Sequence, residues 1–449
     1  MQWCFTLQHN VFKAFSLPQG NAVCRFVTCC MLMWYTLIMI GIMGVLIPTE
    51  GETSTKATHH HKRYSHQGNV GPGYSWHFPK DHGLHAQYAT EWWYTTGHLW
   101  THHPKTTQKH PQPTPSPQER FGYELTFFKA TPSFPQKQNG FSDFLQSPWG
   151  FAPTYTAHFA LTQPAHSSPS KRFVVFEQVA RSGTQEAGAS PTGLKLWHRQ
   201  WTLQAKAPHI WHLRTGDPQT GIPPVLNLTL TLQQPPTLQG DATGYSQKTS
   251  CTGCGSLYYS VAHIHTQGTI TTLEKGRRIT REVTGVSWFD HEIMQTYQYP
   301  QLIGWDWFAI HIPATRTTPR RALMLYQLRR QADKTHPYTI EPYSYAALIL
   351  ENGQKITAKL GKQVFLKPLR YWQSPATKGR YPVSWDITWP AQKLKLQVNT
   401  RLDNQEIITH LLKTPTYWEG TCEVKGVINQ AVVSGDAYLE MTGYAPPNR

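Results

Sequence analysis

The stretch Thr90-Glu-Trp-Trp-Tyr-Thr-Thr-Gly-His-Leu-Trp100 indicates the fold class of this chain. Aromatic residues and threonine dominate it, and both favour extended strands over helices. Because side chains alternate between the two faces of a strand, Glu91 and Trp93 are expected to share a face. A carboxylate among large aromatic side chains is typical of an apolar pocket with a few polar anchors. The stretch therefore predicts a strand that borders a binding site.

Short segments of the same kind recur along the chain. Phe121-Gly-Tyr-Glu-Leu-Thr-Phe-Phe-Lys129 alternates with period two over its first half. The other expected strands span residues 154–162, 173–180, 194–198, 201–205, 209–215, 225–232, 257–265, 269–273, 281–289, 302–312, 322–329, 346–350, 363–369, 383–389, 393–402, 424–428 and 435–441. Turn-forming residues separate them, and the one helical period is a weak one near residues 142–149. We therefore expect an all-β protein built from sandwiches or barrels.

The chain length of 449 residues exceeds that of one ordinary domain and predicts two. The Pro- and Gln-rich segment 233–240 is the expected boundary between a first domain, residues 71–236, and a second, residues 245–445. A polar, His-rich segment at 52–70 is interpreted as a flexible tether. Residues 101–119, which are rich in Pro, His, Gln and Thr, are expected to form a long hairpin loop.

Residues 1–51 have the composition of an export signal or a membrane anchor. Residues 27–47 are almost entirely apolar, and Lys13 and Arg25 precede them. The apolar run is long enough for a spanning helix of about 20 residues. Both a cleaved signal peptide and a retained anchor are consistent with this pattern. We expect the rest of the chain to be exported to the periplasm or the cell exterior, either free or anchored to the inner membrane by residues 27–47.

The chain is basic, with a formal net charge of +16. The basic residues are scattered rather than gathered, which is typical of a solvated surface. No nucleic-acid partner is expected, because no recognised nucleic-acid-binding motif accompanies the charge. Attraction to an anionic lipid or polysaccharide is the functional alternative.

Three cysteines lie outside the leader, namely Cys251, Cys254 and Cys422. The spacing of Cys251-Thr-Gly-Cys254 fits a local disulfide, a redox pair or half of a zinc site. No second C-x-x-C motif occurs outside the leader, which excludes a structural zinc site of four cysteines. A local disulfide or a pair of inert thiols is expected.

Ser287-Trp-Phe-Asp-His-Glu292 combines aromatic and ionisable residues in a second predicted strand. Asp290 is the first candidate for a general acid, because a carboxyl group in an apolar pocket stays protonated more readily. Trp288 is expected on the same strand face, whereas His291, a further catalytic candidate, lies on the opposite face. Glu91 in the first stretch is the second candidate acid.

A third cluster, Gly304-Trp-Asp-Trp-Phe308, places Asp306 between two tryptophans that share the opposite strand face. The substrate-binding candidates from all clusters are Trp92, Trp93, Tyr94, Tyr258, Trp288, Trp305 and Trp307. Tyr94, Tyr258 and Tyr259 are candidates for orienting water or a carbonyl group. Each carboxylate also has a structural interpretation, in which it accepts an indole N–H while a histidine caps a turn. Both interpretations stay open for Asp290, Glu91 and Asp306.

A metal site is the third alternative for this part of the chain. His263-Ile-His265 places two imidazoles on one strand face, and Asp81, His82 and His85 could join them. Chance pairs are frequent among 23 histidines, so we expect no metal and no cofactor. A serine hydrolase is not expected, because no G-x-S-x-G motif occurs and Ser287 lies in mid-strand.

Phe78-Pro-Lys-Asp-His-Gly83 and Thr90-Glu-Trp-Trp-Tyr-Thr-Thr-Gly97 open an ordered series of blocks. The later blocks lie at residues 125–128, 157–160, 258–260, 285–292, 304–309, 323–329, 417–420 and 438–444. In this order the series resembles the AttH-like family of secreted hydrolases, which is related to carotenoid 1,2-hydratase. The resemblance covers nearly the whole chain after the leader.

The resemblance implies two lipocalin-like β-barrels in tandem, with a cavity between or within them. Relatives include cofactor-independent hydratases of isoprenoid double bonds and enzymes that shape cycloadditions of long polyenes. On their pattern the functional aspartate falls on Asp290. Ile293 stands where the family usually has Trp, and this departure is expected to remove one wall of the substrate pocket. Cys251 and Cys254 stand where relatives generally have a plain polar loop.

Two functions are consistent with these observations. The first is a cofactor-independent hydratase or hydrolase that acts on a hydrophobic, isoprenoid- or lipid-like substrate by carboxylate acid–base chemistry. The second is a non-catalytic lipid carrier of the envelope that works with an ABC-type export transporter. The expected partners are a hydrophobic small molecule or lipid and, through the leader, the membrane.

Overall fold

The computed structural model describes residues 70–101, 119–131, 152–164, 167, 172–216, 224–295, 299, 301–316, 318–332, 338–409, 411 and 416–446. The leader, nearly all of the tether, most of the 101–119 loop and the weak helical period at 142–149 lie outside these residues. All described residues belong to one compact unit, Tyr64–Arg449. No helix within the described ranges is long and apolar enough to cross a membrane.

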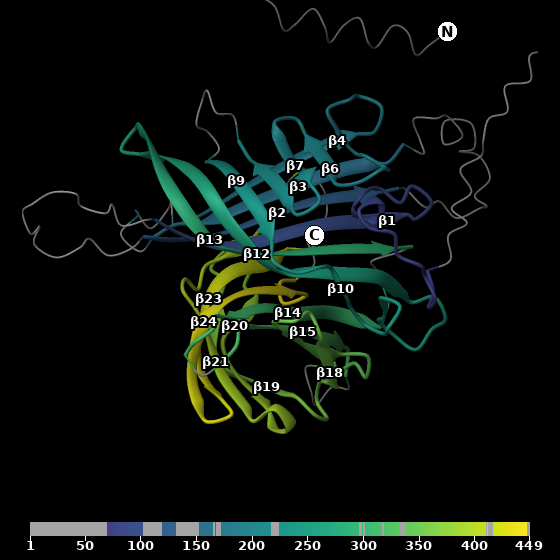
Figure 1. Cartoon of the computed structure of the whole chain (residues 1–449), viewed down its shortest axis with the longest axis vertical. Coiled ribbons are helices and arrows are strands. Elements are labelled where there is room, and N and C mark those ends of the chain that lie inside the picture. The colour runs from purple at the N-terminus through teal and green to yellow at the C-terminus, as the bar shows by residue number, and fades with distance from the viewer. Residues whose placement is uncertain are drawn as a thin grey trace, which may run out of the picture. The chain divides into compact units, whose positions relative to one another are not determined.

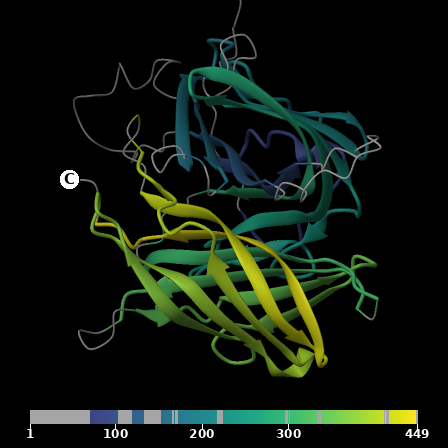
Figure 2. The ribbon, with the colours of Figure 1, turned by 90° about the vertical axis from the view of Figure 1, so that its left-hand side faces the viewer.

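The described chain is all-β, as the sequence predicts, and forms two large antiparallel sheets that Figures 1 and 2 show stacked one above the other. The first sheet has 13 strands, in the order β4-β3-β2-β1-β13-β12-β9-β8-β7-β6-β5, with β10 and β11 added on β12. Its strands are β1 (Thr90–Thr101), β2 (Arg120–Ala130), β3 (Thr154–Thr162), β4 (Phe173–Arg181), β5 (Ala187–Ala189), β6 (Lys195–His198), β7 (Trp201–Ala207), β8 (Ile210–Arg214), β9 (Val225–Leu232), β10 (Thr237–Leu238), β11 (Tyr245–Gln247), β12 (Gly255–Glu274) and β13 (Arg277–Met294).

The second sheet has 11 strands, in the order β18-β17-β15-β14-β24-β23-β21-β20-β19, with β16 on β15 and β22 on β23. Its strands are β14 (Leu302–Ile312), β15 (Arg321–Arg330), β16 (Thr339–Ile340), β17 (Tyr345–Leu350), β18 (Lys355–Lys359), β19 (Phe365–Gln373), β20 (Arg380–Trp389), β21 (Leu394–Thr400), β22 (Glu406–Ile407), β23 (Tyr417–Ile428) and β24 (Ala431–Thr442). Two single-turn 3-10 helices complete the described elements, η1 (Lys80–His82) and η3 (Pro390–Gln392).

The sheets divide the chain at a different place from the predicted domains. β11, β12 and β13, which the sequence analysis assigned to the second domain, pair within the first sheet. β13 lies between β1 and β12, so the first sheet needs residues up to Met294 to be continuous. The boundary between the sheets therefore falls between Met294 and Leu302 rather than at 236–245, because strand pairing and not a Pro-rich segment decides it.

Each sheet curls around a hydrophobic core of its own, and a third core lies between the sheets. The first core includes Trp93, Trp201 and Phe289, and the second includes Trp385 and Leu396. The third contains residues of both sheets, among them Tyr94, Tyr258, Ala262, Trp288, Trp307, Met324 and Tyr326. β1 and β2 of the first sheet contact β24 and β23 of the second. A strand at this junction is therefore buried on both faces.

The register of β1 on β13 brings the two predicted clusters together. Tyr94 lies opposite Asp290, Trp93 opposite His291 and Trp92 opposite Glu292. Because directly opposite residues in an antiparallel pair point to the same face of the sheet, the two residues of each of these pairs lie on one face. Trp92, Tyr94, Asp290 and Glu292 face the second sheet, and Trp93 and His291 face the core of the first.

Several sequence expectations about local structure are met. The predicted strands 154–162, 225–232 and 302–312 coincide with β3, β9 and β14. Cys251 and Cys254 form a disulfide, and Cys422 is a buried free thiol. The predicted strand 363–369 is displaced, since β19 runs from Phe365 to Gln373. That strand is largely exposed and lacks the apolar alternation that marks a strand in sequence.

Candidate active site

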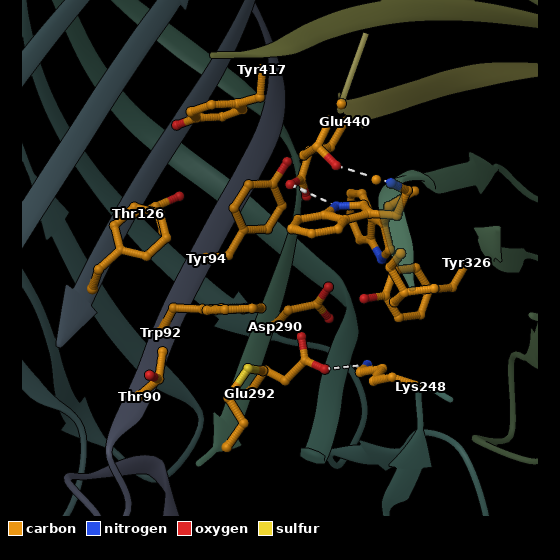
Figure 3. A pocket seen from close by; sticks show the side chains of 18 of the residues that line it. Thr90, Trp92, Tyr94, Thr126, Lys248, Asp290, Glu292, Tyr326, Tyr417 and Glu440 are labelled. Atoms are coloured by element: carbon orange, nitrogen blue, oxygen red, sulfur yellow. Dashed lines mark hydrogen bonds and ion pairs between the residues drawn. The ribbon is translucent and has the colours of Figure 1, made fainter. Parts of the chain in front are cut away.

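A cavity of about 630 Å³ lies between the two sheets. Its walls come from β1, β2, β3, β12 and β13 of the first sheet and from β14, β15, β23 and β24 of the second. Figure 3 shows Trp92, Tyr94, Asp290 and Glu292 around this space, with Tyr326, Tyr417 and Glu440 on its other sides. The volume is in the range of sites that bind drug-sized molecules.

Five of the seven predicted substrate-binding residues line this cavity, namely Trp92, Tyr94, Tyr258, Trp305 and Trp307. Trp288 lies behind Asp290 in the core between the sheets and does not line the cavity. Trp93 is on the opposite strand face, inside the first core, where it stacks on His291. The two-residue period of β1 separates Trp93 from its neighbours Trp92 and Tyr94.

Asp290 lines the cavity and is held by three neutral donors. Its Oδ1 accepts hydrogen bonds from Ser260 Oγ at 2.5 Å and from Trp288 Nε1 at 2.7 Å. Its Oδ2 accepts one from Tyr258 Oη at 2.7 Å. Since a carboxyl oxygen has two acceptor positions, Oδ2 keeps one for a further partner in the cavity.

The protonation of Asp290 is governed by its burial. The residue is 4 % exposed, and burial raises its pKa to about 7, although the hydrogen bonds from Ser260, Tyr258 and Trp288 lower it. A carboxyl group with this pKa is present in both forms near neutral pH. It can therefore act as a proton donor where an ordinary aspartate is fully ionised.

A hydrogen bond from the second sheet completes the support of Asp290. Trp307 Nε1 on β14 donates to Tyr258 Oη at 3.1 Å, and the same hydroxyl donates to Asp290 Oδ2. Trp307 also packs edge-on against Tyr94 and Trp288. Asp290 is thus positioned by residues of both sheets.

A second carboxylate, Glu292, faces the same cavity beside Asp290. Its Oε1 accepts hydrogen bonds from Lys248 Nζ at 2.5 Å and from Ser256 Oγ. The Lys248 ammonium lies 4.3 Å from the ring centre of Tyr326 and donates to Ser246 Oγ at 3.1 Å. This buried ion pair was not among the sequence candidates, because residue 248 lies in an ordinary polar loop sequence.

Glu419 and Glu440 form a third group of carboxyls on the opposite wall. They lie directly across from each other on β23 and β24. Tyr94 Oη donates to Glu419 Oε2 at 2.8 Å, and Trp305 Nε1 donates to Glu440 Oε1 at 2.9 Å. Burial raises the pKa of Glu440 to about 8, and burial and the neighbouring Glu440 raise that of Glu419 well above its usual value. Glu440 is therefore an uncharged hydrogen-bonding group near neutral pH.

Glu91 and His291, the other two catalytic candidates, do not reach the cavity. Both are 0 % exposed and belong to the core side of the first sheet. Glu91 Oε1 accepts hydrogen bonds from His85 Nδ1 at 2.8 Å and from His291 Nε2 at 2.9 Å. The three catalytic candidates are thus split between two faces, because Asp290 and His291 are neighbours on one strand. The two-residue period of a strand predicts these opposite faces, so the three residues do not form one site at the cavity.

This second group is a buried hydrogen-bond network. Burial raises the pKa of Glu91, but the hydrogen bonds from His291 and His85 outweigh it and lower the pKa to about 2. Tyr259 Oη, which was predicted to orient water, instead contacts His291 Nδ1 at 3.2 Å and His82 Nδ1 at 2.7 Å. The network joins the segment before β1 to β1, β12 and β13.

His85, Glu91 and His291 are also the one group within the described ranges whose ligand atoms converge, all within 4.8 Å of one another. Their separations of 2.8 and 2.9 Å are those of hydrogen bonds, whereas ligands around a tetrahedral zinc ion lie about 3.3 Å apart. We therefore describe the group as a network and assign no metal to it. Of the predicted ligand pair, His263 is buried beside His311, while His265 is exposed.

Two further sequence candidates have structural positions. Asp306 is fully buried, 3.2 Å from Arg329 Nε, and accepts hydrogen bonds from Gln327 and Tyr444. These contacts give Asp306 a structural position, although its partners are a guanidinium, an amide and a phenol rather than the predicted indole N–H. Ile293 packs among Val70, Tyr88, Tyr245 and Leu257, on the face away from the cavity. The expectation that Ile293 removes a pocket wall is therefore wrong, because an odd-numbered residue of β13 cannot face the cavity that Asp290 lines.

The sheets and the cavity define an all-β protein with two lipocalin-like halves and a cavity between them. The sequence profile of the AttH-like family matches residues 69–444. The chain belongs to the AttH-like family. No match was found among curated proteins.

Two solved structures resemble this one over most of the chain. An AttH protein from Nitrosomonas europaea is 26 % identical, with a TM-score of 0.64 over 84 % of this chain and 100 % of that one. Kievitone hydratase from Nectria haematococca is 13 % identical, with a TM-score of 0.51 over 79 % of this chain and 89 % of that one. At that identity, the second similarity establishes the fold alone.

Proposed function

We propose that the cavity between the sheets binds an apolar, unsaturated molecule and that Asp290 donates a proton to it. The reaction we favour is the addition of water to a carbon–carbon double bond, with no cofactor. The observation that carries the proposal is the position of Asp290, a buried carboxyl group with a pKa near 7 and one open acceptor position in an aromatic cavity. General acid catalysis of this kind contributes roughly 10²- to 10⁴-fold in rate.

The walls of the cavity suit the intermediate of such a reaction. Protonation of a double bond leaves a carbocation, and the faces of Trp and Tyr rings attract a nearby cation by about 0.5–2 kcal/mol each. Trp92, Tyr94, Trp305 and Trp307 supply such rings around Asp290. The name of kievitone hydratase, whose fold this chain shares, is consistent with hydration chemistry.

Mass spectrometry on the full-length protein and its Asp290→Asn variant tests the proposal. Molecules that co-purify are identified first, and both proteins are then incubated with isoprenoid alkenes such as geranylgeraniol. We expect wild type to form a product that is heavier than the alkene by one water, about 18 mass units, as general acid hydration predicts. The Asp290→Asn variant is expected not to form this product. An unaltered lipid with both proteins would instead favour the lipid carrier.

The proposed location of the protein outside the cytoplasm rests on the leader and is supported by the Cys251–Cys254 disulfide. Disulfides persist in oxidising compartments and are rare in the cytosol. We propose that residues 27–47 attach the protein to the membrane and that an ABC-type export transporter is its partner. Protease treatment of intact cells tests the location, since an exported protein is digested without lysis.

A further inference from the structure

We propose that Glu292 is the second catalytic carboxylate of the cavity, the base that receives a proton from the attacking water, with Lys248 as its counter-ion. The inference rests on the proposed function, because this base acts only after Asp290 has protonated the substrate. Glu292 and Lys248 both line the cavity, and Figure 3 shows the pair next to Asp290.

Asp290 and Glu292 present their side chains to the same cavity. They are two residues apart on β13 and share a face, so their backbones are separated by about 6.6 Å. An acid and a base on one strand face can therefore both reach a substrate bound in the cavity.

The partners of the two carboxylates differ in charge. Asp290 is contacted by the neutral donors Ser260, Tyr258 and Trp288. Glu292 is contacted by the Lys248 ammonium, both side chains being at most 5 % exposed. A cation favours the ionised form of a carboxyl group, and neutral burial favours the protonated form. Two carboxylates whose surroundings differ in this way are suited to opposite roles in proton transfer.

Glu292 also has an acceptor that is open to the cavity. Its Oε1 takes the hydrogen bonds from Lys248 and Ser256, and within the described chain no donor contacts Oε2. Lys248 is occupied by Glu292, Ser246 and the Tyr326 ring. The free acceptor of the ion pair is therefore Oε2 of Glu292.

The carboxyls on the other wall are less suited to the role of base. Glu419 and Glu440 are contacted by the neutral groups Tyr94 and Trp305. Burial raises the pKa of Glu440 to about 8, so the group carries a proton at neutral pH. A carboxylic acid is a poor proton acceptor, which leaves Glu292 as the base.

The proposed step balances in atoms and electrons. The carboxylic proton of Asp290 adds to one carbon of the double bond, and the π electron pair forms the new C–H bond. The oxygen of a water molecule bonds to the cationic carbon, and its proton passes to Glu292. Transfer of that proton back to Asp290 restores the enzyme, so the net change is the addition of one water.

The experiment compares full-length wild type with Asp290→Asn, Glu292→Gln and Lys248→Met. Geranylgeraniol and squalene serve as probes in ¹⁸O-labelled water, and mass spectrometry measures the label in the product. Glu406→Gln is the matched control, since Glu406 is a buried carboxyl in the second sheet that Ser374 and Tyr381 contact. We expect Glu292→Gln to lose about 10²- to 10⁴-fold in rate while its probe affinity stays near that of wild type. Its thermal midpoint is expected to fall, because Lys248 loses the partner of a buried ion pair, so rates are compared at temperatures where the variant is folded.

The outcomes separate this inference from the proposed function. Wild-type rates in Glu292→Gln together with a loss in Asp290→Asn would overturn the role of Glu292 and leave the proposed function intact. Wild-type rates in Asp290→Asn would overturn both. A loss in all three variants, with Glu406→Gln unaffected, supports the inference.

Infrared difference spectra give a second readout that does not depend on turnover of either probe. At pH 6, subtraction of Asp290→Asn from wild type is expected to reveal a protonated carboxyl band, and subtraction of Glu292→Gln an ionised carboxylate band. A protonated Glu292 in the wild type would overturn the inference, because a protonated group cannot accept the proton of water.

Discussion

Trp307 on β14 of the second sheet donates a 3.1 Å hydrogen bond to the hydroxyl of Tyr258 on β12 of the first. That hydroxyl in turn donates to Asp290 Oδ2 at 2.7 Å. The orientation of the proposed acid therefore depends on the packing of one sheet against the other. The proposed site therefore depends on both halves of the chain.

Trp307→Phe tests whether the orientation of Asp290 depends on this contact between the sheets. Phenylalanine keeps most of the ring contacts with Tyr94 and Trp288 but removes the indole N–H. We expect a loss of about 1–2 kcal/mol in unfolding free energy, from one buried hydrogen bond and a smaller side chain, with a clear drop in turnover. Urea unfolding and product assays measure the two effects. Trp197→Phe, in which an outer tryptophan loses its bond to Gln185, is the control that should leave turnover intact.

Asp290 predicts a specific pH dependence of stability. Its folded-state pKa of about 7 lies above its ordinary value of 3.8, because burial favours the protonated form. The folded state thus binds this proton more tightly than the unfolded state does. The contribution of this proton to the free energy of unfolding is fully present below about pH 4 and is expected to be lost as the pH rises through about 7. Unfolding of Asp290→Asn across this range is expected to show a smaller decline than wild type, by a few kcal/mol at about 1.4 kcal/mol per pKa unit. Equal declines would contradict the assignment.

Glu91→Gln tests the separation of the two faces of β1. The carboxylate accepts hydrogen bonds from His85 and His291 inside the first core, so its loss leaves that network incomplete. We expect destabilisation of about 3–5 kcal/mol, the size seen when one partner of a buried charged pair is removed. Probe binding at temperatures where the variant is folded is expected to match wild type. Weaker binding would instead connect the network to the cavity.

The Cys251–Cys254 disulfide closes the loop that carries Lys248, whose backbone N–H donates to the Cys254 carbonyl at 2.8 Å. The double variant Cys251→Ser, Cys254→Ser is expected to lose about 2 kcal/mol in unfolding free energy, the loop-entropy value for so short a ring. We also expect lower turnover, because Lys248 is then held less firmly beside Glu292. Treating wild type with a dithiol reductant should reproduce both effects, and no change in either protein would show that the loop is held by its other contacts.

Much of the local structure follows directly from the amino-acid sequence. Aromatic residues and threonine mark β1 as a strand. Alternating apolar and polar residues mark the first half of β2, since the two-residue period of a strand leaves a pattern that needs no tertiary contact to read. The same period places Asp290 with Trp288 and away from His291, as the hydrogen bond between Asp290 and Trp288 illustrates. The spacing of Cys251 and Cys254 likewise made a local disulfide one of two expectations.

Only the tertiary structure decided which strand faces meet. The pairing of β1 with β13 and the packing of the second sheet over them join Tyr94, Asp290 and Trp307, which are far apart in sequence. Lys248 carried no sequence signal, because a lysine in a loop is ordinary until another element buries it. Glu419 lies in the block at 417–420, but its position opposite Glu440 required the pairing of β23 with β24. Glu91 and Asp290 looked alike in sequence. Their surroundings differ because the imidazoles of His85 and His291 contact Glu91, whereas neutral donors and a cavity surround Asp290, and these surroundings exist only once the sheets have formed.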